Sequence, residues 1–452
     1  MENYKEKYES LLILYEESLQ TIKSLLQRIS TLEAEVSRLK NRPNSNNSSM
    51  PPSADITRLG KKNPNRIQSG KKPGGQSGHK GTFLKMREHT DEIVPHSPQV
   101  CNSCGLNLGD VIEKEFSRGQ IIDIPIIKTR VTEHISYVKQ CPCCQAVNKT
   151  SLPGTLDYCN VQYGPNIRNL IVFLSARHFV PIKRIQELIY ALTGERVSTG
   201  FINNCIYQKS QDASPVYDQI LEQIIATNCV HSDETGFKVK NLKYWMWYWG
   251  TEIWKYFEVS AQRGYNTITN VLGDAYHDFV LVSDRWAAQL KTNCKGHQLC
   301  LVHLIRDCNK LIEQYNSKWA GKLKKIFEEI INIKSKGEKI TKRTITSIED
   351  KLATLLENQL LKSHDKIITF RHQLKKQRKY LTTCLRYHDV PAHNNQAERS
   401  IRNVKLKTKI STNFRSEEGA KNYAVIRSII DSAIAKGLNV FDVLRNPNLL
   451  FN

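Results

Sequence analysis

The first forty residues place apolar side chains at heptad spacing. One row contains Tyr8, Tyr15, Ile22, Ile29 and Val36, and a second row three places on contains Leu11, Leu25, Leu32 and Leu39. Such a repeat predicts a coiled coil over residues 1–42 and therefore self-association, although Ser18 interrupts the seam. The alternative is an amphipathic helix packed on its own protein. Pro43 ends the helix in either case.

Residues 43–90 contain few apolar side chains and many lysines, glycines and polar residues. Such a composition cannot bury a core, so the segment is expected to be a linker. Because it is basic and its glycines allow close backbone approach, the functional interpretation is an arm that follows DNA phosphates through Lys71, Lys72 and Lys80. A solvated linker is the other interpretation.

Residues 91–160 contain two Cys-x-x-Cys pairs, Cys101 with Cys104 and Cys141 with Cys144, separated by residues 105–140. Two such pairs supply the four thiolates of a tetrahedral structural Zn²⁺ site, and four thiolates leave no open coordination position for catalysis. Cys143 is an alternative ligand to Cys144. Between the pairs, VTEHISYVKQ alternates as a strand does. The domain is therefore expected to resemble a zinc ribbon.

From residue 161 to residue 225 the apolar period becomes helical. The stretch PIKRIQELIYAL, a Thr-Gly turn and VSTGFINNCIYQ follow one another as the two helices of a helix-turn-helix, with Ser198 or Thr199 as N-cap of the second. We expect this second helix either to contact DNA or to pack in the core.

Beyond residue 226 the pattern is that of strands. Three runs, CVHSDETGFKVK, KYWMWYWGT and IWKYFEVS, predict a meander, and DFVLVSDRW predicts a central strand beside the first, followed by a helix from about Ala287. The expected fold class is thus multidomain α+β, with an RNase H-like core in residues 226–312 and 391–452. A helical insertion over residues 313–390 divides the core, and a C-terminal helix closes it.

Three acidic residues carry the candidate chemistry: Asp233 and Asp284 at strand edges and Glu398 at the start of a basic helix. Carboxylates brought close together repel one another unless a divalent cation compensates, and Mg²⁺ or Mn²⁺ prefers such oxygen ligands. Two such ions can activate the attacking oxygen and stabilise the leaving oxygen of a phosphodiester. Locally, each acid is equally well a turn residue, a cap or, for Glu398, a partner of Arg402.

Composition narrows the partner and the compartment. Lys and Arg number 66 against 44 Asp and Glu, a formal charge of +22 that favours a polyanion, with nucleic acid first. No apolar stretch approaches the length of a bilayer span, and the charged N-terminus does not look like a secretory signal. A cytoplasmic location is expected, where the 12 cysteines stay reduced and paired cysteines hold metal.

The order of motifs along the chain resembles the bacterial insertion-sequence transposases of the sixty-six family, of the TnpC type. The motifs are the N-terminal zipper, NSSMPPSAD, KKPGGQSGHKG, the four cysteines, DETGFKV, SDRWAA, QLCLVH and NNQAERSIR. The resemblance implies a DDE transposase that cleaves and joins DNA, with Asp233, Asp284 and Glu398 as its metal-binding acids. Its partners are then the transposon ends, target DNA, further copies of the chain and, in some elements, accessory proteins.

Two further residue sets follow from this comparison. Cys300-x-x-His303 resembles a signature of several such transposases, and we interpret it as a structural pair that positions the insertion near the acids. Arg399, Arg402 and Lys405 follow Glu398 and are expected to face DNA phosphates, with Lys407 and Lys409 beyond them. His393, Asn394 and Asn395 are expected to cap this helix. Two other functions remain open, a non-catalytic zinc-containing DNA-binding regulator with a coiled coil, and a stand-alone nuclease or resolvase.

Overall fold

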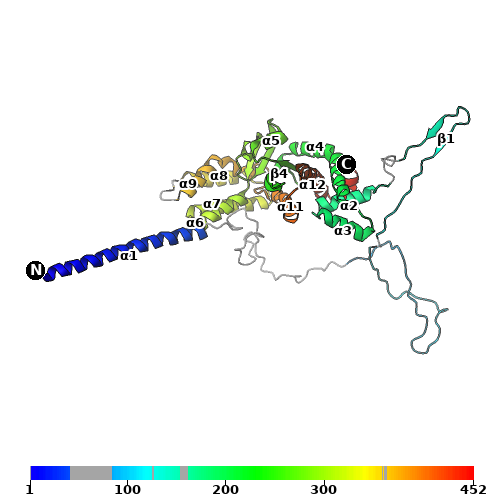
Figure 1. The fold of residues 1–452 in the computed structure, drawn as a ribbon, viewed down its shortest axis with the longest axis horizontal. Coiled ribbons are helices and arrows are strands. Elements are labelled where there is room, and N and C mark those ends of the chain that lie inside the picture. The colour runs from blue at the N-terminus through cyan, green and yellow to red at the C-terminus, as the bar shows by residue number, and fades with distance from the viewer. Residues whose placement is uncertain (1, 41–83, 125–126, 153–160, 359, 361–363) are drawn as a thin grey trace.

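The computed structural model of the chain describes all residues except 1, 41–83, 125–126, 153–160, 359 and 361–363 (Figure 1). The predicted basic arm, with Lys71, Lys72 and Lys80, falls almost entirely outside the described residues. The N-terminal heptads form one helix, α1 (Glu2–Lys40), which ends before Pro43 as predicted. Those of its apolar side chains that the structure describes face solvent: Ile22, Leu25, Ile29 and Leu32 are each about half exposed.

The cysteine-rich segment contains one small hairpin, β1 (Val138–Gln140) with β2 (Val147–Lys149). The strand expected over residues 131–140 is therefore wrong for residues 131–137. The partner strand offers only three residues, so the earlier positions have no backbone to pair with.

Three helices follow: α2 (Pro165–Ala176), α3 (Ile182–Thr193) and α4 (Thr199–Ile225). Gly194 ends α3 in the left-handed conformation, and the Ser198 hydroxyl caps α4 by accepting a 3.0 Å hydrogen bond from the Phe201 N–H. The α3–turn–α4 arrangement is as expected, but α4 continues far past Gln208. Its second half buries Val216, Ile220 and Ile224 against the central sheet.

The central sheet has five strands in the order β5-β4-β3-β6-β7. Its members are β3 (Cys229–Val239), β4 (Leu242–Gly250), β5 (Lys255–Ser260), β6 (His277–Ser283) and β7 (Cys294–Leu299). The meander β3-β4-β5 is antiparallel, whereas β6 lies parallel to β3 and β7 parallel to β6. Helix α5 (Tyr265–Leu272) connects β5 to β6. The sheet is therefore mixed, in an α+β chain.

Strand β4 shows why both faces of the sheet are covered. Met246 and Tyr248 pack with α2 and with two later helices, α11 (Asn395–Ser411) and α12 (Glu417–Ala435). Trp247 and Trp249 pack on the opposite face with α4 and α5. All four side chains are fully buried. An uninterrupted apolar run of this kind is what a central strand requires, because successive residues point to opposite faces.

The prediction of a helix from about Ala287 is wrong. The chain forms a short 3₁₀ turn, η2 (Gln289–Lys291), and then the edge strand β7. The apolar pattern conceals β7 because two of its buried residues are polar: His297 and Gln298. Their burial is satisfied by tertiary contacts, among them the 2.7 Å hydrogen bond that Gln298 Oε1 accepts from the Cys384 N–H.

The insertion is helical, as expected, but its helices begin at Leu301 and not at residue 313. Its hydrophobic core is shared with β6 and β7 through Val280, Val282 and Leu299. It contains α6 (Leu301–Tyr315), α7 (Lys318–Ser335), α8 (Lys342–Glu357), α9 (Asp365–Lys376), η3 (Arg378–Tyr380) and α10 (Thr383–Arg386). The chain then returns to the sheet through α11 (Asn395–Ser411), α12 (Glu417–Ala435), α13 (Val440–Arg445) and η4 (Pro447–Leu450). Figure 1 shows the insertion on one side of the sheet and α2 to α4 on the other.

The exposed apolar row of α1 predicts that this helix pairs with α1 of another copy. Substituting Leu25→Asp should lower the oligomeric state measured by light scattering after size exclusion, because it places a charge in the apolar seam. Ser24→Asp, one position away and outside both heptad rows, is the matched control and should change nothing. An unaltered oligomer in Leu25→Asp and in a chain lacking residues 1–42 would show that α1 does not mediate association.

Candidate functional site: three converging carboxylates

Asp233 and Asp284 come to the same level of the sheet because their strands are parallel neighbours. The register pairs His231 of β3 with Val282 of β6, and two residues further along each strand lie Asp233 and Asp284. Equal steps along neighbouring strands keep the two side chains on one face, with strand axes about 4.8 Å apart. Asp233 and Asp284, although far apart in the sequence, therefore lie close together in the fold.

The pKa of Asp233 reflects the short distance between these two acids. Burial raises the pKa of Asp233 well above its usual value, and the charges of Asp284 and Glu234 raise it further. A buried carboxylate next to another is unfavourable when ionised, so this pair favours either a proton or a cation.

Helix α11 brings Glu398 to the pair through a buried contact of Asn394. The Asn394 side-chain amide donates a 2.7 Å hydrogen bond to the Ser232 carbonyl, and its oxygen lies 2.9 Å from His231 Nδ1. Asn394 is fully buried and its side chain makes no cap hydrogen bond. Asn394 therefore occupies the N-cap position of α11 as expected, but its side chain does not supply the cap hydrogen bond. It fastens the start of α11 to β3, immediately beside Asp233.

His303 of α6 joins the second and third acids. Its Nδ1 lies 2.9 Å from Asp284 Oδ1 and 3.6 Å from Glu398 Oε1, and Arg306 Nη1 lies 3.0 Å from its Nε2. Burial alone lowers the pKa of His303, but its contacts with Asp284 and Cys300 outweigh burial and raise it. When His303 is neutral, Nε2 accepts from Arg306 and the N–H at Nδ1 faces the carboxylates; when the ring is protonated, Nδ1 still carries an N–H toward them but Nε2 no longer accepts from Arg306.

The chemistry of these donors fits a divalent cation. Asp284 Oδ1, Glu398 Oε1 and His303 Nδ1 are buried yet make no hydrogen bond of normal geometry within the described residues, although they lie at ion-pair distance. Unsatisfied carboxylate oxygens at one point are the ligands that Mg²⁺ or Mn²⁺ takes. Asp284 also lies with Cys300 and His303 in a group whose donor atoms are all within 4.8 Å of one another.

Cys300 has a structural contact as well. Its sulfur accepts a 3.2 Å hydrogen bond from the Asn394 N–H, and the Leu301 N–H donates to the Ala392 carbonyl at 3.0 Å. The beginning of α6 is thereby attached to the segment just before α11. Cys300 and His303 place the insertion next to the acids.

A second layer around Asp233 was not foreseen from the sequence. Arg263 donates to Glu234 Oε1 from Nε at 3.0 Å and from Nη2 at 2.8 Å, and Gln289 donates to Glu234 Oε2 at 3.1 Å. The Arg263 guanidinium lies 4.0 Å from the ring centre of Trp286 and 4.6 Å from that of Trp245. The adjacency of two acids in HSDETG was the only sequence signal. Arg263 and Gln289 thus pair with Glu234, whose charge also acts on Asp233.

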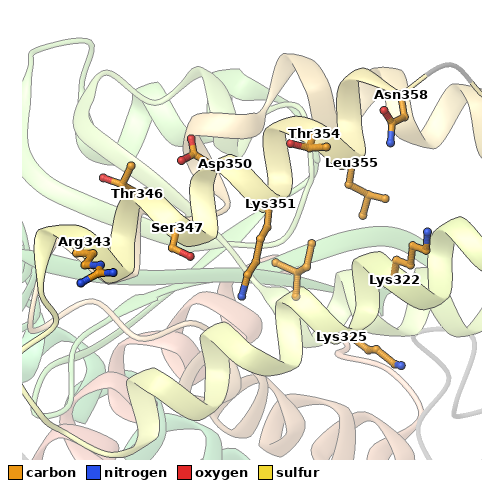
Figure 2. A pocket seen from close by; sticks show the side chains of 11 residues that line it. Lys322, Lys325, Arg343, Thr346, Ser347, Asp350, Lys351, Thr354, Leu355 and Asn358 are labelled. Carbon is orange, nitrogen blue, oxygen red and sulfur yellow. The ribbon is translucent and has the colours of Figure 1, made fainter.

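The basic residues after Glu398 are accessible. Arg399, Arg402 and Lys405 are exposed along α11. A second surface rich in cations lies in the insertion, where a shallow groove runs between α7 and α8. It is lined by Lys322, Lys325, Arg343 and Lys351, by the hydroxyls of Thr346, Ser347 and Thr354, and by one acid, Asp350. Figure 2 shows these side chains projecting from the two helices. Lys351 is paired with Glu329 at 2.8 Å, whereas the other three cations have no ion-pair partner within the described residues.

The cysteine pairs form two turns of the same geometry. The Gly105 N–H donates to the Cys101 carbonyl and the Gln145 N–H to the Cys141 carbonyl, each at 2.9 Å. The backbone N–H groups that point at each first sulfur, with the thiol of Cys104 or Cys144, lower the pKa of Cys101 and Cys141. Within the described residues, no three of these cysteines share one ligand shell. The repeated geometry favours Cys144 over Cys143 as the second ligand.

Acids on a mixed sheet, a cysteine-rich module and exposed basic side chains are together typical of proteins that act on DNA. The model of the Transposase IS66 family matches residues 160–422, more than half of the chain, and the chain belongs to this family of DDE transposases. The zinc-finger binding domain of transposase IS66 matches residues 98–145, and a family of unknown function (DUF6444) matches residues 7–85. Among curated proteins, none matches this chain. Within the described residues, no helix has the length and apolar character of a membrane span.

The matched zinc-finger domain predicts about one Zn²⁺ per chain, held by Cys101, Cys104, Cys141 and Cys144. Elemental analysis of the purified protein should find it, and Cys144→Ser should remove it because three thiolates hold zinc more weakly. Cys143→Ser is the matched control and should keep its zinc. Loss of zinc in Cys143→Ser with retention in Cys144→Ser would exchange the two assignments, and a metal-free wild type would refute the site.

Proposed function

We propose that this protein binds the terminal inverted repeats of its insertion sequence and catalyses metal-dependent cleavage and transfer of DNA strands. The observation that carries this proposal is that Asp284 acts on the buried Asp233 and shares His303 with Glu398, although the three acids come from distant segments. The strand order β5-β4-β3-β6-β7, with an antiparallel meander next to two parallel strands, supports an RNase H-like core. Asp233 lies within β3 and Asp284 directly follows the neighbouring strand β6, as such a core requires.

Each residue of the site has a separate role in this proposal. Asp233, Asp284 and Glu398 would hold Mg²⁺ or Mn²⁺, which supplies charge compensation for the phosphodiester and lowers the pKa of an attacking water. Asn394 and Cys300 fix the spacing of α11 and α6. His303, with its N–H toward Asp284 and Glu398, orients both carboxylates and limits their repulsion.

The reaction needs no covalent protein intermediate. In the first step water attacks the phosphorus, the P–O3′ bond breaks, and the transposon end leaves with a 3′-hydroxyl after taking up a proton. In the second step that 3′-oxygen attacks a phosphodiester of target DNA. A new P–O bond forms, the target strand breaks, and its leaving 3′-oxygen takes the proton. The numbers of phosphodiester bonds before and after transfer are equal.

One observation favours the alternative of a non-catalytic DNA-binding regulator. His303 and Arg306 already lie against Asp284 and Glu398, at 2.9 Å and 3.8 Å respectively, so the acids are partly compensated by the protein alone. In a regulator this cluster would only connect α6, α11 and the sheet. The two functions differ in what substitution of an acid does.

Asp233→Asn should abolish strand cleavage of a terminal-repeat duplex in Mg²⁺ while leaving its binding intact. The loss should exceed the roughly 10- to 100-fold that removal of an outer partner of a metal ligand costs. In EDTA the melting temperature should not fall, because Asn keeps the shape and removes the repulsion with Asp284. Asp278→Asn, on β6 but exposed and paired with Lys295, is the matched control. Equal cleavage by Asp233→Asn and wild type would favour the regulator.

The groove between α7 and α8 should bind DNA phosphates. Replacing Lys322, Lys325 and Arg343 by Gln should make the slope of log binding constant against log salt less negative, by about 0.9 for each phosphate that the groove no longer neutralises. The control replaces three exposed lysines outside the groove, Lys318, Lys336 and Lys339, and removes the same charge. Identical slopes in the two triple variants would show that the groove does not bind DNA.

A further inference from the structure

A cleft of about 930 Å³ lies between the first turns of α4 and the loop that joins α11 to α12. We call it the α4–α12 cleft. Its volume is within the range of small-molecule sites. Asp233, Asp284, Glu398 and His303 do not line it. The α4 residues in its wall, among them Asn203 and Tyr207, belong to the helix that the sequence assigned to DNA contact or to core packing. They face this cleft.

The cleft has an uncompensated positive charge. Lys183, Lys407 and Arg415 line it, and none of them makes an ion pair or side-chain hydrogen bond within the described residues. The only acid in its lining is Glu418, which is exposed. Lys407 is half-buried, and burial lowers its pKa to about 8. A lysine placed in such surroundings costs stability, so its presence favours an anionic occupant.

The cleft also offers unpaired groups that match a nucleobase. Within the described residues, the side-chain amides of Asn203, Asn204 and Asn422 make no hydrogen bond, and Tyr423 Oη is a buried hydroxyl without a partner. Amides pair with base edges through a donor and an acceptor at once. The Tyr207 ring is 37% exposed and gives a surface on which a base can stack.

Helix α11 connects the cleft to the acids. Glu398 lies in its first turn, and Lys407 lies about 14 Å further along the axis at 1.5 Å per residue. The two residues are about two and a half turns apart, so Lys407 lies on the opposite side of α11 from Glu398. The axial distance equals about four nucleotides of a DNA strand, and a strand that joins the two points also passes round the helix. Arg402 and Lys405 are exposed between them, on the side of α11 that carries Glu398.

We propose that the α4–α12 cleft binds an unpaired nucleotide of the DNA strand close to the bond that the acids cut. Lys183, Lys407 and Arg415 contact its phosphates, the asparagine amides contact the base edge, and Tyr207 stacks on the base. This proposal rests on the proposed function and adds a subsite for unpaired DNA to it.

The test measures binding of a fluorescein-labelled eight-nucleotide single strand to the full-length protein by anisotropy, in EDTA so that no cleavage occurs. Lys407→Met and the double variant Asn203→Ala, Asn204→Ala should each weaken binding about tenfold, as should Tyr207→Ala. Tyr207→Phe keeps the ring and should retain the affinity. Gln208→Ala, exposed on α4 outside the cleft, is the matched control. Because Lys407→Met removes a half-buried charge, its melting temperature should not fall.

Three results would overturn the proposal. One is wild-type affinity in both Lys407→Met and the asparagine double variant. Another is competition by octaglutamate as strong as by the unlabelled single strand, which would make the cleft a general anion or acidic-peptide site. The third is equal competition by ATP, which would assign it to free nucleotides. These outcomes are independent of catalysis, since the cleavage assay with Asp233→Asn tests the acids and leaves the cleft unaltered.

Discussion

The buried amide of Asn394 is the contact on which the geometry of the acids depends. Its side chain bonds to β3 at His231 and Ser232, and its backbone N–H donates to Cys300 at the start of α6. Burial lowers the pKa of His231 to about 4, so this ring stays neutral and Nδ1–H donates to the amide oxygen. Three chain segments meet at this residue, and each of them carries a member of the site or its partner.

Such a connection is needed because the acids repel each other. Two carboxylates 4 Å apart repel by about 4 kcal/mol at an effective dielectric constant of about 20. A single hydrogen bond contributes only about 1 kcal/mol net. One bond cannot hold the cluster together without a cation. The three hydrogen bonds of Asn394, the α6–Ala392 backbone bond and the His303 contacts act together. The insertion is part of this arrangement, since its first helix, α6, supplies His303 and begins directly after Cys300.

The sequence predicted those parts of the fold whose burial follows a regular period. The strands β3 to β6 and the helix–turn–helix of α3 and α4 were of this kind, and the level placement of Asp233 and Asp284 follows from the parallel pairing of β3 and β6. Strand β7 was missed because Gln298 is buried through a tertiary hydrogen bond that no local pattern reveals. The side chain of Asn394, which is the N-cap residue of α11, was misjudged as a cap donor or acceptor for the same reason. Glu234 and Arg263 pair across residues far apart in the chain, and only the fold brings them together.

Helices α4 and α11 each pack in the core with one set of residues and present polar or cationic residues with another. The second half of α4 packs in the core through Val216, Ile220 and Ile224, and α11 packs through Ile401 and Val404. Polar and cationic residues on these same helices face the α4–α12 cleft and the exposed side of α11. Groups presented by rigid, core-packed helices hold their spacing better than groups on loops. A DNA strand bound along α11 would therefore have its position relative to Glu398 fixed by one helix, which rises about 1.5 Å per residue. No hinge would lie between the residues that contact the DNA and Glu398.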